Sequence, residues 1–318
     1  MRVRAILNPR AGVAARRALA AVESGRTAWP RLEVMITTRA GDAREWAREA
    51  AGLEYDAVLA VGGDGTANEA AWGLLGSRTA LGLVPVGSGN GLARVLGLSL
   101  RPQRAMAQLA DSVRRRIDVG MANGRPFLNV SGAGFDAAVG AAFHRRGQEG
   151  GRRGVLTYVR LGLAMAFGYR SERWRLEAGG QGYDGTALIV AFLNGRQYGG
   201  GAVVAPRARL DDGVLDVVVI EDAPRLEILW NAPRVFWHTI EGFARYRHFQ
   251  AREALLTGIG TVGHHRDGEP EAGAPRLHVT LEPRALELLV PRPVAEDPDG
   301  PFSATPGPDA STAPPPAA

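Results

Sequence analysis

The stretch that decides the fold is residues 58–69, which read Val58-Leu59-Ala60-Val61-Gly62-Gly63-Asp64-Gly65-Thr66-Ala67-Asn68-Glu69. A short apolar run bounded by glycines is typical of a strand buried on both faces, as in a parallel sheet. Because Gly62, Gly63 and Gly65 lack side chains, we expect positive φ angles here and main-chain N–H groups that approach a ligand closely. Residues 67–75 favour a helix, whose free N–H groups attract anions. The stretch therefore predicts a phosphate-binding turn.

An ordinary strand-to-helix turn is the alternative, and it is the commoner origin of an isolated Gly-Gly-x-Gly. Asp64, Thr66, Asn68 and Glu69 stand within or directly after the glycines and supply polar groups that a phosphate site needs. We therefore favour the phosphate site over the plain turn.

The composition excludes several classes of chemistry. A chain of 318 residues can bury a large core and form two domains. It contains no Cys, which excludes disulfides, thiolate zinc sites and a cysteine nucleophile. It also contains no Lys, which excludes a Gly-Lys-Ser/Thr P-loop and a Schiff-base lysine. The first apolar run is too short for a signal peptide, so we expect a cytoplasmic protein.

The net charge of +5 is carried entirely by Arg on the basic side. A basic surplus can indicate nucleic acid or an anionic membrane surface, but this surplus is mild and we interpret it first as a solvated surface. No interleaving of aromatic and basic residues of an RNA-binding type occurs, so we expect no nucleic-acid partner.

Residues 1–115 alternate strand-like and helix-like stretches, which predicts an α/β domain with a doubly wound, mostly parallel sheet. Ligands of such sheets bind beyond the carboxyl ends of the strands. Each predicted strand ends in a polar or glycine-rich loop, so four loops should meet at one edge: 8–12, 37–41, 62–66 and 87–91. Neither glycine loop fits the dinucleotide fingerprint, which argues against a hydride-transferring enzyme.

Residues 116–292 predict a β-rich, sandwich-like domain of short strands separated by Gly and Asn turns. For its last strand, 286–290, the sequence leaves open a return to the first domain. Two helices interrupt the strands, at 154–169 and 226–239. The first is almost wholly apolar but too short to span a bilayer, so we expect a buried or interdomain helix, with an acyl-chain pocket as the alternative. Residues 293–318 are rich in Pro and Ala and predict a disordered tail.

Three motifs together resemble the diacylglycerol kinase and sphingosine kinase catalytic-domain family. Residues 62–69 are similar to its nucleotide-binding signature, Asn8-Pro9-Arg10-Ala11-Gly12 to its Asn-Pro-x-Ser-Gly, and residues 84–94 to its Leu-Pro-x-Gly-Thr-x-Asn-Asp-Phe-Ala-Arg loop. With Asp267-Gly268-Glu269, the resemblance spans about residues 3 to 292. The Gly-Gly-Asp-Gly-Thr string also occurs in NAD kinases and phosphofructokinases, so only the set is specific.

The resemblance implies that ATP binds at the four loops of the first domain. Ser88 takes the place of a family threonine and keeps its hydroxyl, whereas Ala11 lacks the hydroxyl of the usual serine. For a lone Ser, Thr or Asn the plainer interpretation is a turn or cap residue. The implied nucleotide-binding residues are Asn8, Thr37, Gly62, Gly63, Asp64, Gly65, Thr66, Asn68, Glu69, Ser88 and Asn90.

The resemblance also implies two rival proton acceptors, Asp64 and Asp267. Bacterial diacylglycerol kinases give this role to the aspartate that matches Asp267, and sphingosine kinases give it to the one that matches Asp64. We expect Asp267 to be the base, Glu269 to orient it, and Asp64 to join a water and Mg²⁺ network at the nucleotide. Without the family order, Asp-Gly would indicate only a hairpin turn. The adjacent histidines 264 and 265 are interpreted as surface residues.

A structural Mg²⁺ site is implied by the Asp-Asp-Gly-x-Leu-Asp element at 211–216. The side chain of Asp212 and the carbonyls of Arg209 and Val214 would hold the ion, and oxygen ligands suit Mg²⁺. A metal-free turn is the alternative. Asp136 either approaches a lipid head group or caps a helix, and the stretch 195–201 around Tyr198 is expected to shape a turn.

The sequence thus predicts an ATP-dependent, Mg²⁺-requiring lipid kinase that phosphorylates a primary hydroxyl of a lipid such as diacylglycerol. The alternatives are a sphingoid-base kinase, an NAD kinase and a regulator that binds nucleotide or lipid without catalysis. Arg145-Arg146 and Arg152-Arg153 are candidates for peripheral contact with the inner membrane face. The oligomeric state is left open.

Overall fold

The computed structural model describes residues 1–10, 15–148 and 155–303. Four parallel strands form the sheet of the first domain: β1 (Val3–Leu7), β2 (Leu32–Ile36), β3 (Ala57–Gly62) and β4 (Ala80–Pro85). They lie in the order β4-β3-β1-β2. Every residue of β1, β3 and β4 is buried, including Arg4 on β1. The unbroken apolar run of β3 predicted this burial.

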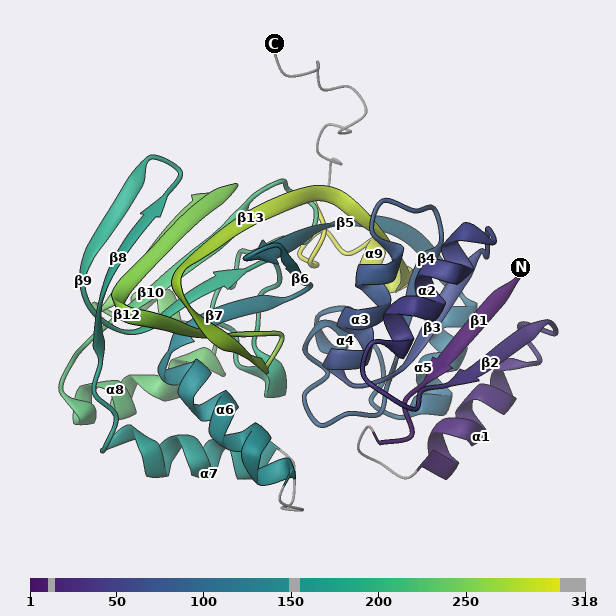
Figure 1. Ribbon diagram of the computed structural model, residues 1–318, viewed down its shortest axis with the longest axis horizontal. Helices are drawn as coiled ribbons and strands as arrows, with labels where there is room; N and C mark the ends of the chain where they lie inside the picture. The colour runs from purple at the N-terminus through teal and green to yellow at the C-terminus, as the bar shows by residue number, and fades with distance from the viewer. Residues whose placement is uncertain (11–14, 149–154, 304–318) are drawn as a thin grey trace, which may run out of the picture.

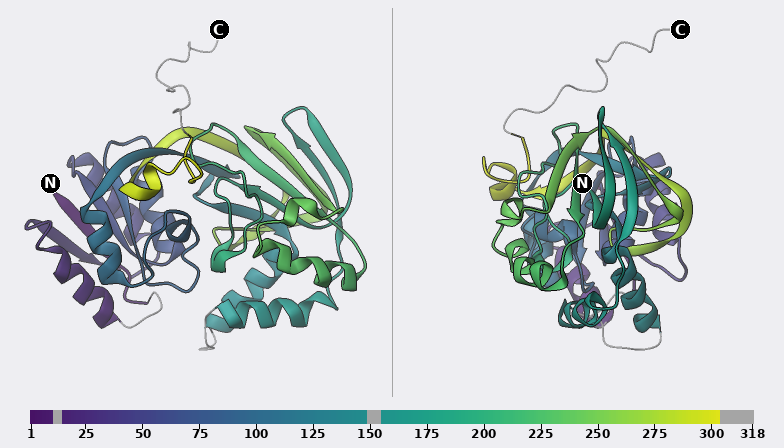
Figure 2. Two further views of the ribbon diagram at one scale, coloured as in Figure 1. Left: turned by 180° about the vertical axis from the view of Figure 1, so that it is seen from behind. Right: turned by 90° about the vertical axis from the view of Figure 1, so that its left-hand side faces the viewer.

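Helices cover both faces of this sheet, which confirms the doubly wound prediction (Figures 1 and 2). α2 (Asp42–Gly52) packs with α3 (Asp64–Leu74) on one face, and α1 (Ala15–Gly25) packs with α5 (Pro102–Ala110) on the other. The short α4 (Gly91–Val95) follows the loop after β4. α3 begins at Asp64 and not at residue 67, so Asp64 stands in the first helical turn.

The second domain is a sandwich-like set of antiparallel strands. They comprise β5 (Ser112–Ala122), β6 (Arg125–Phe127), β7 (Val130–Gly134), β8 (Glu172–Ala178), β9 (Gln181–Leu193), β10 (Leu215–Glu221), β11 (Tyr246–Ala251), β12 (Glu253–Arg266) and β13 (Glu269–Pro291). A buried cluster that includes Phe127, Trp174 and Phe192 fills their interior. β11 was not predicted, because its alternating basic residues leave it mostly exposed.

β13 joins the two domains. It pairs with β12 and β5, and its end pairs in parallel with β4 through Leu288 and Leu81. The strand bends where its register with β5 shifts between Glu282 and Leu286, and Arg284 there has a φ of 51°. Figure 1 shows β13 arching from one domain to the other. The structure therefore places residues 286–290 beside the first domain, which is the option that the sequence left open.

The chain stays in the fold beyond residue 292, in contrast to the expected tail. α9 (Arg292–Ala295) follows β13, and Phe302 is only 2% exposed. The amide of Leu210 donates a hydrogen bond to Pro301 O at 2.8 Å. One aromatic anchor thus holds a Pro-rich segment whose average composition indicates disorder. Residues 304–318 lie outside the described residues.

Three α-helices of the second domain lie on one side of its strands: α6 (Phe135–Gln148), α7 (Val155–Ala166) and α8 (Arg225–Asn231). Three 3₁₀ turns complete it: η1 (Gly199–Gly201), η2 (Ala232–Val235) and η3 (Ile240–Gly242). For α6 only a helix start at Asp136 was considered, and its length was not predicted. The helix expected at 226–239 ends at Asn231, shortly before Pro233. α7 was expected to be buried, but Leu163 is 51% exposed.

Of the helices that the described ranges contain, none combines the length and apolarity needed to cross a bilayer.

Candidate active site

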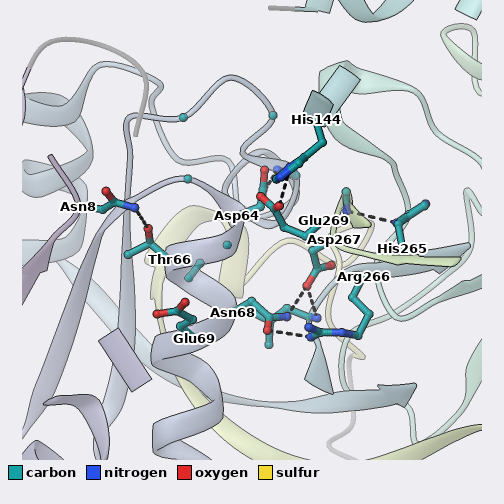
Figure 3. Close-up of a pocket in the computed structure, with 18 of the residues that line it drawn as sticks. Asn8, Asp64, Thr66, Asn68, Glu69, His144, His265, Arg266, Asp267 and Glu269 are labelled. Atoms are coloured by element: carbon teal, nitrogen blue, oxygen red, sulfur yellow. Dashed lines mark hydrogen bonds and ion pairs between the residues drawn. The ribbon is translucent and has the colours of Figure 1, made fainter. Parts of the chain in front are cut away.

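A cleft of about 1380 Å³ lies between the two domains. One wall consists of the loops that follow β1, β2, β3 and β4, and the other consists of α6, Tyr158 on α7, Tyr198 and the turn between β12 and β13. Figure 3 shows the labelled side chains of both walls facing one another. The expected convergence of four loops at one sheet edge is therefore present, and Asp64 and Asp267 share the cleft.

The loop after β1 is tied to the start of α3. Asn8 Nδ2 donates a hydrogen bond to Thr66 Oγ1 at 3.1 Å, and Asn8 Oδ1 accepts one from the amide of Arg10 at 2.9 Å. Both Asn8 and Thr66 line the cleft, as predicted from the sequence. Residues 11 and 12 of this loop lie outside the described residues.

The glycines of the first loop make room for neighbouring segments of the chain. The sequence had predicted positive φ angles at these glycines. Gly62, Gly63 and Gly65 all lack a positive φ. A Cβ on Gly62 would lie 2.4 Å from Thr66 Cβ, and one on Gly87 would lie 2.6 Å from Gly63 Cα. The bare backbones therefore let the loops after β3 and β4 touch.

Asp64 connects these two loops. Its Oδ2 accepts a hydrogen bond from the amide of Asn90 and its Oδ1 accepts one from the amide of Gly91, each at 2.7 Å. Burial raises the pKa of Asp64 to about 6, and the nearby carboxylates of Asp267 and Glu269 act in the same direction against these two amides.

Asn90 stabilises the loop after β4 and does not line the cleft. It has a φ of 53° and is buried, and its Nδ2 donates to Gly87 O at 2.7 Å. Asn90 and Gly62 are not among the cleft-lining residues, whereas Ser88 is. The structure thus gives Asn90 a supporting position where the sequence predicted contact with a nucleotide.

Glu69 likewise supports a loop. Its Oε1 accepts a hydrogen bond from the amide of Gly41 at 3.0 Å, which ties α3 to the loop after β2. Asp42 holds the same loop by accepting the amides of Thr38 and Arg39 at 2.7 and 3.0 Å. Thr37 is on this loop and lines the cleft, where the sequence predicted a nucleotide-binding residue.

The side chain of Asp267 accepts more hydrogen bonds than any other carboxylate that lines the cleft. It accepts the amides of Leu128, Asn129 and Val130 at 2.8, 2.9 and 3.0 Å, and Asn68 Nδ2 at 2.9 Å. Asp267 itself has a φ of 48°, which is uncommon outside glycine. The aspartate therefore anchors the β12–β13 turn to the chain before β7 and to α3.

Asn68 and Arg266 complete this anchor. Asn68 Oδ1 accepts a hydrogen bond from Arg266 Nη1 at 3.1 Å, while Asn68 Nδ2 also donates to Pro126 O at 2.8 Å. Arg266 is only 7% exposed and pairs with Glu271. A buried guanidinium held in this way fixes α3 of the first domain against the second.

Glu269 meets a residue that the sequence did not single out. His144 Nδ1 on α6 lies 3.1 Å from Glu269 Oε2. Glu269 also faces the first domain, because a Cβ on Gly65 would lie 3.4 Å from Glu269 Oε1. No sequence signal marked His144, since the length of α6 beyond a start at Asp136 was not predicted.

A buried polar network stands behind the Asp-Gly-Glu turn. Asp136 Oδ2 accepts the hydroxyl of Tyr198 at 2.7 Å and lies 3.0 Å from His265 Nε2. The amide of Gly268 donates to His265 Nδ1 at 3.2 Å. Nδ1 is therefore the acceptor and Nε2 carries the proton.

Several expectations are corrected by this network. His264 and His265 are 6% and 2% exposed, so the prediction that both are surface residues is wrong. Burial lowers the pKa of His264. Tyr198 does more than shape a turn, because it lines the cleft and holds Asp136. Asp136 also accepts the amide of Ala137 at 2.8 Å, so its carboxylate is engaged on both oxygens.

The acidic segment at 211–216 lies away from the cleft, where β5, β10 and the C-terminal segment meet. Asp118 accepts the amides of Gly213 and Arg284, each at 2.7 Å, and Asp211 accepts the amide of Ser303 at 2.6 Å. Burial raises the pKa of Asp212 to about 6, with Asp118 among the neighbouring carboxylates that add to it. Within the described ranges, no group of three or more acidic or histidine side chains is arranged to hold a metal ion.

Comparison with known proteins matches both halves of the chain. The diacylglycerol kinase catalytic domain matches residues 2–122, and the YegS C-terminal NAD kinase beta sandwich-like domain matches residues 129–290. A protein of Pseudomonas aeruginosa strain PAO1 named "Probable lipid kinase YegS-like" is 33% identical over 288 residues, which cover 86% of this chain and 89% of that protein.

A second relative and a solved structure agree with this match. The diacylglycerol kinase of Bacillus subtilis strain 168 is 34% identical over 199 residues, covering 61% of this chain and 64% of that protein. The crystal structure of a diacylglycerol kinase from Bacillus anthracis str. Sterne has a TM-score of 0.69 at 22% identity, covers 92% of this chain and 98% of that one, and shows the shared fold. The chain belongs to the diacylglycerol kinase catalytic-domain family and carries the YegS type of C-terminal domain.

Proposed function

We propose that this protein is an ATP-dependent lipid kinase that transfers the γ-phosphate to a primary hydroxyl of a lipid such as diacylglycerol. The observation that carries the proposal is the cleft, in which Asp64 and the polar loops of the first domain face Asp267 and Glu269 of the second. Phosphoryl transfer needs positioned phosphates and a carboxylate that accepts the proton of the attacking hydroxyl. The names of the relatives and the family of the chain support the same activity.

The two walls of the cleft suit the two substrates. The first-domain wall presents main chain, hydroxyls and guanidinium groups, which bind phosphates. The opposite wall presents Phe143 and Tyr158, whose rings meet edge to face with centroids 5.5 Å apart. We infer that ATP binds on the first domain and that the acceptor lipid binds against α6 and α7.

The hydrogen bonds favour Asp64 over Asp267 as the proton acceptor. The donors to Asp267 occupy all four of its lone-pair positions, whereas Asp64 accepts two and keeps two. The raised pKa of Asp64, about 6, also suits a base that works near neutral pH. We therefore exchange the roles expected from the sequence, so that Asp64 accepts the proton and Asp267 positions the turn that carries Glu269.

In the proposed step the lipid hydroxyl oxygen forms a bond to the γ-phosphorus while the bond from that phosphorus to the β,γ-bridging oxygen breaks. The hydroxyl proton passes to the Asp64 carboxylate, and ADP leaves. The Mg²⁺ that accompanies ATP would neutralise charge on the phosphates. We expect an acid limb in kcat/KM for the lipid with a midpoint near pH 6.

We also propose a structural Mg²⁺ held by Asp212 and the main-chain oxygens of Arg209 and Val214. The half-buried Asp212 carboxylate has a pKa raised by burial and by neighbouring carboxylates, so a hard cation with oxygen ligands fits there. Adding Mg²⁺ should raise the melting temperature of the wild type but not that of Asp212→Asn. An equal rise in both would remove this site.

Two alternative functions are kinases with another phosphate acceptor, and the third is a regulator that transfers no phosphate. An NAD kinase is disfavoured by the family of the chain and by the paired 84–94 loop and Asp-Gly-Glu turn. A sphingoid-base kinase retains support from Gly-Ser-Gly-Asn-Gly at 87–91. A regulator without catalysis is disfavoured by the intact carboxylates of the cleft.

The deciding experiment incubates the purified protein with labelled ATP, Mg²⁺ and a total lipid extract, and identifies the labelled lipid. Asp64→Asn should abolish the label while ATP still binds, because the proton acceptor is lost but the Asn side-chain oxygen still accepts one of the two loop amides. A surface variant, Glu177→Gln on β8, should label lipid as the wild type does. A parallel incubation supplies NAD in place of the lipid extract, and labelled NADP as its product would contradict the proposal in favour of an NAD kinase. Absence of any labelled product in both incubations would favour the regulator.

We further propose peripheral contact with anionic membranes. Arg145 and Arg146 are exposed at the end of α6, close to the cleft. Arg152 and Arg153, the other half of the predicted cluster, lie outside the described residues. Charge reversal at Arg145 and Arg146 should weaken binding to anionic vesicles, and wild-type binding should fall with salt. Binding that ignores both changes would remove this contact.

A further inference from the structure

The apolar residues exposed on the surface are concentrated on one side of the second domain. Eight of the fourteen large hydrophobic side chains that are exposed in the described residues belong to α7, α8, η2 or the residues that follow them. We call this surface the aromatic face and define it by its six most exposed members: Leu163, Phe167, Leu226, Trp230, Phe236 and Trp237. Trp230 and Trp237 are 85% and 71% exposed, which is rare for so large an apolar side chain.

The segments of the aromatic face lie side by side. Arg225 Nη2 at the start of α8 donates a hydrogen bond to Tyr169 O, just after α7, at 2.7 Å. Ile228 and Val235 turn inward and pack on the core of the domain, so the opposite sides of α8 and η2 remain outward. Both views of Figure 2 show α7 and α8 next to each other at one end of the molecule.

α7 contributes only basic and neutral residues to the aromatic face, and an acidic residue, Glu172, lies beyond its end. α7 contains no acidic residue, and Arg160 on it and Arg170 after it are exposed. Trp prefers the boundary between hydrocarbon and head groups, because its ring is apolar and its N–H is polar. A helix that carries apolar residues on one side and Arg on another lies flat in that boundary.

The aromatic face continues into the cleft. Tyr158 is on α7 and lines the cleft beside Phe143 and His144. One helix therefore reaches from the exposed apolar surface to the wall proposed for the acceptor. A lipid with long acyl chains needs such a continuous apolar path between a bilayer and the cleft, whereas a protein partner would not.

We propose that the aromatic face docks this kinase on the surface of an anionic lipid bilayer, with Trp230 and Trp237 inserted at the head-group boundary. This inference rests on the proposed lipid kinase function, because it assigns the face that delivers the acceptor to the cleft. α7 then lies along the bilayer, and Tyr158 stands where the acceptor leaves it.

The test compares wild type with Trp230→Gln/Trp237→Gln by cosedimentation with vesicles of phosphatidylcholine and phosphatidylglycerol in a three-to-one ratio, without nucleotide. Removing two inserted rings should weaken binding at least about tenfold. The matched control is Ile259→Gln on β12, because Ile259 is also 85% exposed but lies outside the aromatic face. It should bind as the wild type does. Equal melting temperatures of the three proteins confirm folding.

Two further readouts follow the same variants. Vesicles should shift the tryptophan emission of the wild type to shorter wavelength, because Trp230 and Trp237 leave water on insertion. Trp29 and Trp174 are already buried and should not contribute to the shift. The double variant should lose turnover of long-chain diacylglycerol in vesicles and keep wild-type turnover of a water-soluble, short-chain diacylglycerol.

The outcomes separate this inference from the proposed function. If wild type and double variant bind vesicles equally, or if Ile259→Gln loses as much, the docking surface is wrong even when short-chain diacylglycerol is phosphorylated. If vesicle binding depends on the two Trp residues but no lipid is phosphorylated, the kinase function is wrong and the surface stands. A dimer that the double variant dissociates, without vesicle binding, overturns the inference in favour of self-association.

Discussion

Asp64 holds a negative charge beside two other carboxylates, Asp267 and Glu269, in a wall of the cleft. Its pKa in the folded protein is about 6, against 3.8 for the ordinary side chain. The native state therefore binds more protons than the unfolded state between about pH 4 and 6. The stability that this group contributes is full below pH 4 and is lost as the pH rises to 6.

We expect Asp64→Asn to abolish this dependence. Relative to wild type, its free energy of unfolding should improve by on the order of 2–3 kcal/mol between pH 4 and 7. The new side chain also loses one hydrogen bond to a loop amide. That loss lowers the free energy of unfolding equally at pH 4 and pH 7, so it does not affect the difference between the two pH values. Urea unfolding at pH 4, 5, 6 and 7 with EDTA present measures the difference. A difference that does not change with pH would contradict the assignment.

His265 is predicted to position the Asp-Gly-Glu turn without touching the substrate. Its Nδ1 holds the amide of Gly268 at 3.2 Å, and its Nε2 faces Asp136. In His265→Gln the side-chain amide can replace Nε2 but not Nδ1, so kcat should fall by up to about tenfold. The KM for ATP should stay unchanged.

His265→Asn is the matched variant, because its amide can replace Nδ1 but not Nε2. It should recover part of kcat although it loses the contact to Asp136. Steady-state kinetics and melting temperatures of both variants decide the point. If kcat simply follows the melting temperature in both, His265 is only structural.

At the scale of elements, the loops after β3 and β4 work as one unit because Gly87 lies against Gly63. In Gly87→Ala, the new Cβ would lie 2.6 Å from Gly63 Cα and 3.0 Å from Asn90 Oδ1. One of the loops must shift, which also displaces the amides that Asp64 holds. We expect the KM for ATP to rise at least about tenfold and stability to fall by about 1–3 kcal/mol.

Gly52→Ala at the end of α2 is the control, since a Cβ there meets open space. It should keep the KM for ATP and lose no stability. Equilibrium binding of an ATP analogue and thermal unfolding measure both quantities. Unchanged ATP binding in Gly87→Ala would show that the two loops tolerate separation.

At the scale of the whole molecule, the C-terminal segment holds parts of both domains together. Phe302 packs in the core cluster of the first domain, and Arg115 on β5 lies over its ring at 4.9 Å. Phe302→Ala should lower the free energy of unfolding by about 3–5 kcal/mol, the usual loss for a buried aromatic ring. Urea unfolding measures it. Phe167→Ala, at a ring 68% exposed, should cost little, and equal losses in the two variants would contradict this account.

Local patterns identified the parallel sheet and its glycine loops, whereas Asp267 and Glu269 were singled out by the family resemblance. Local patterns missed the extent of α6, and with it His144, because small residues such as Ala and Gly give that helix little apolar periodicity. They also missed the network of Tyr198, Asp136 and His265, because its members are 62 and 129 residues apart in the chain. A lone Tyr, Asp or His gives no local sign of such a partner.

The sequence alone determined where the parallel strands end and where glycines follow them, because strand period and glycine content are properties of neighbouring residues. The tertiary structure alone decided what each carboxylate can do. Asp64 and Asp267 have the same side chain, yet one keeps free lone pairs and a raised pKa while the other is fully hydrogen-bonded. Burial and donors set that difference, and both come from segments far away in the chain.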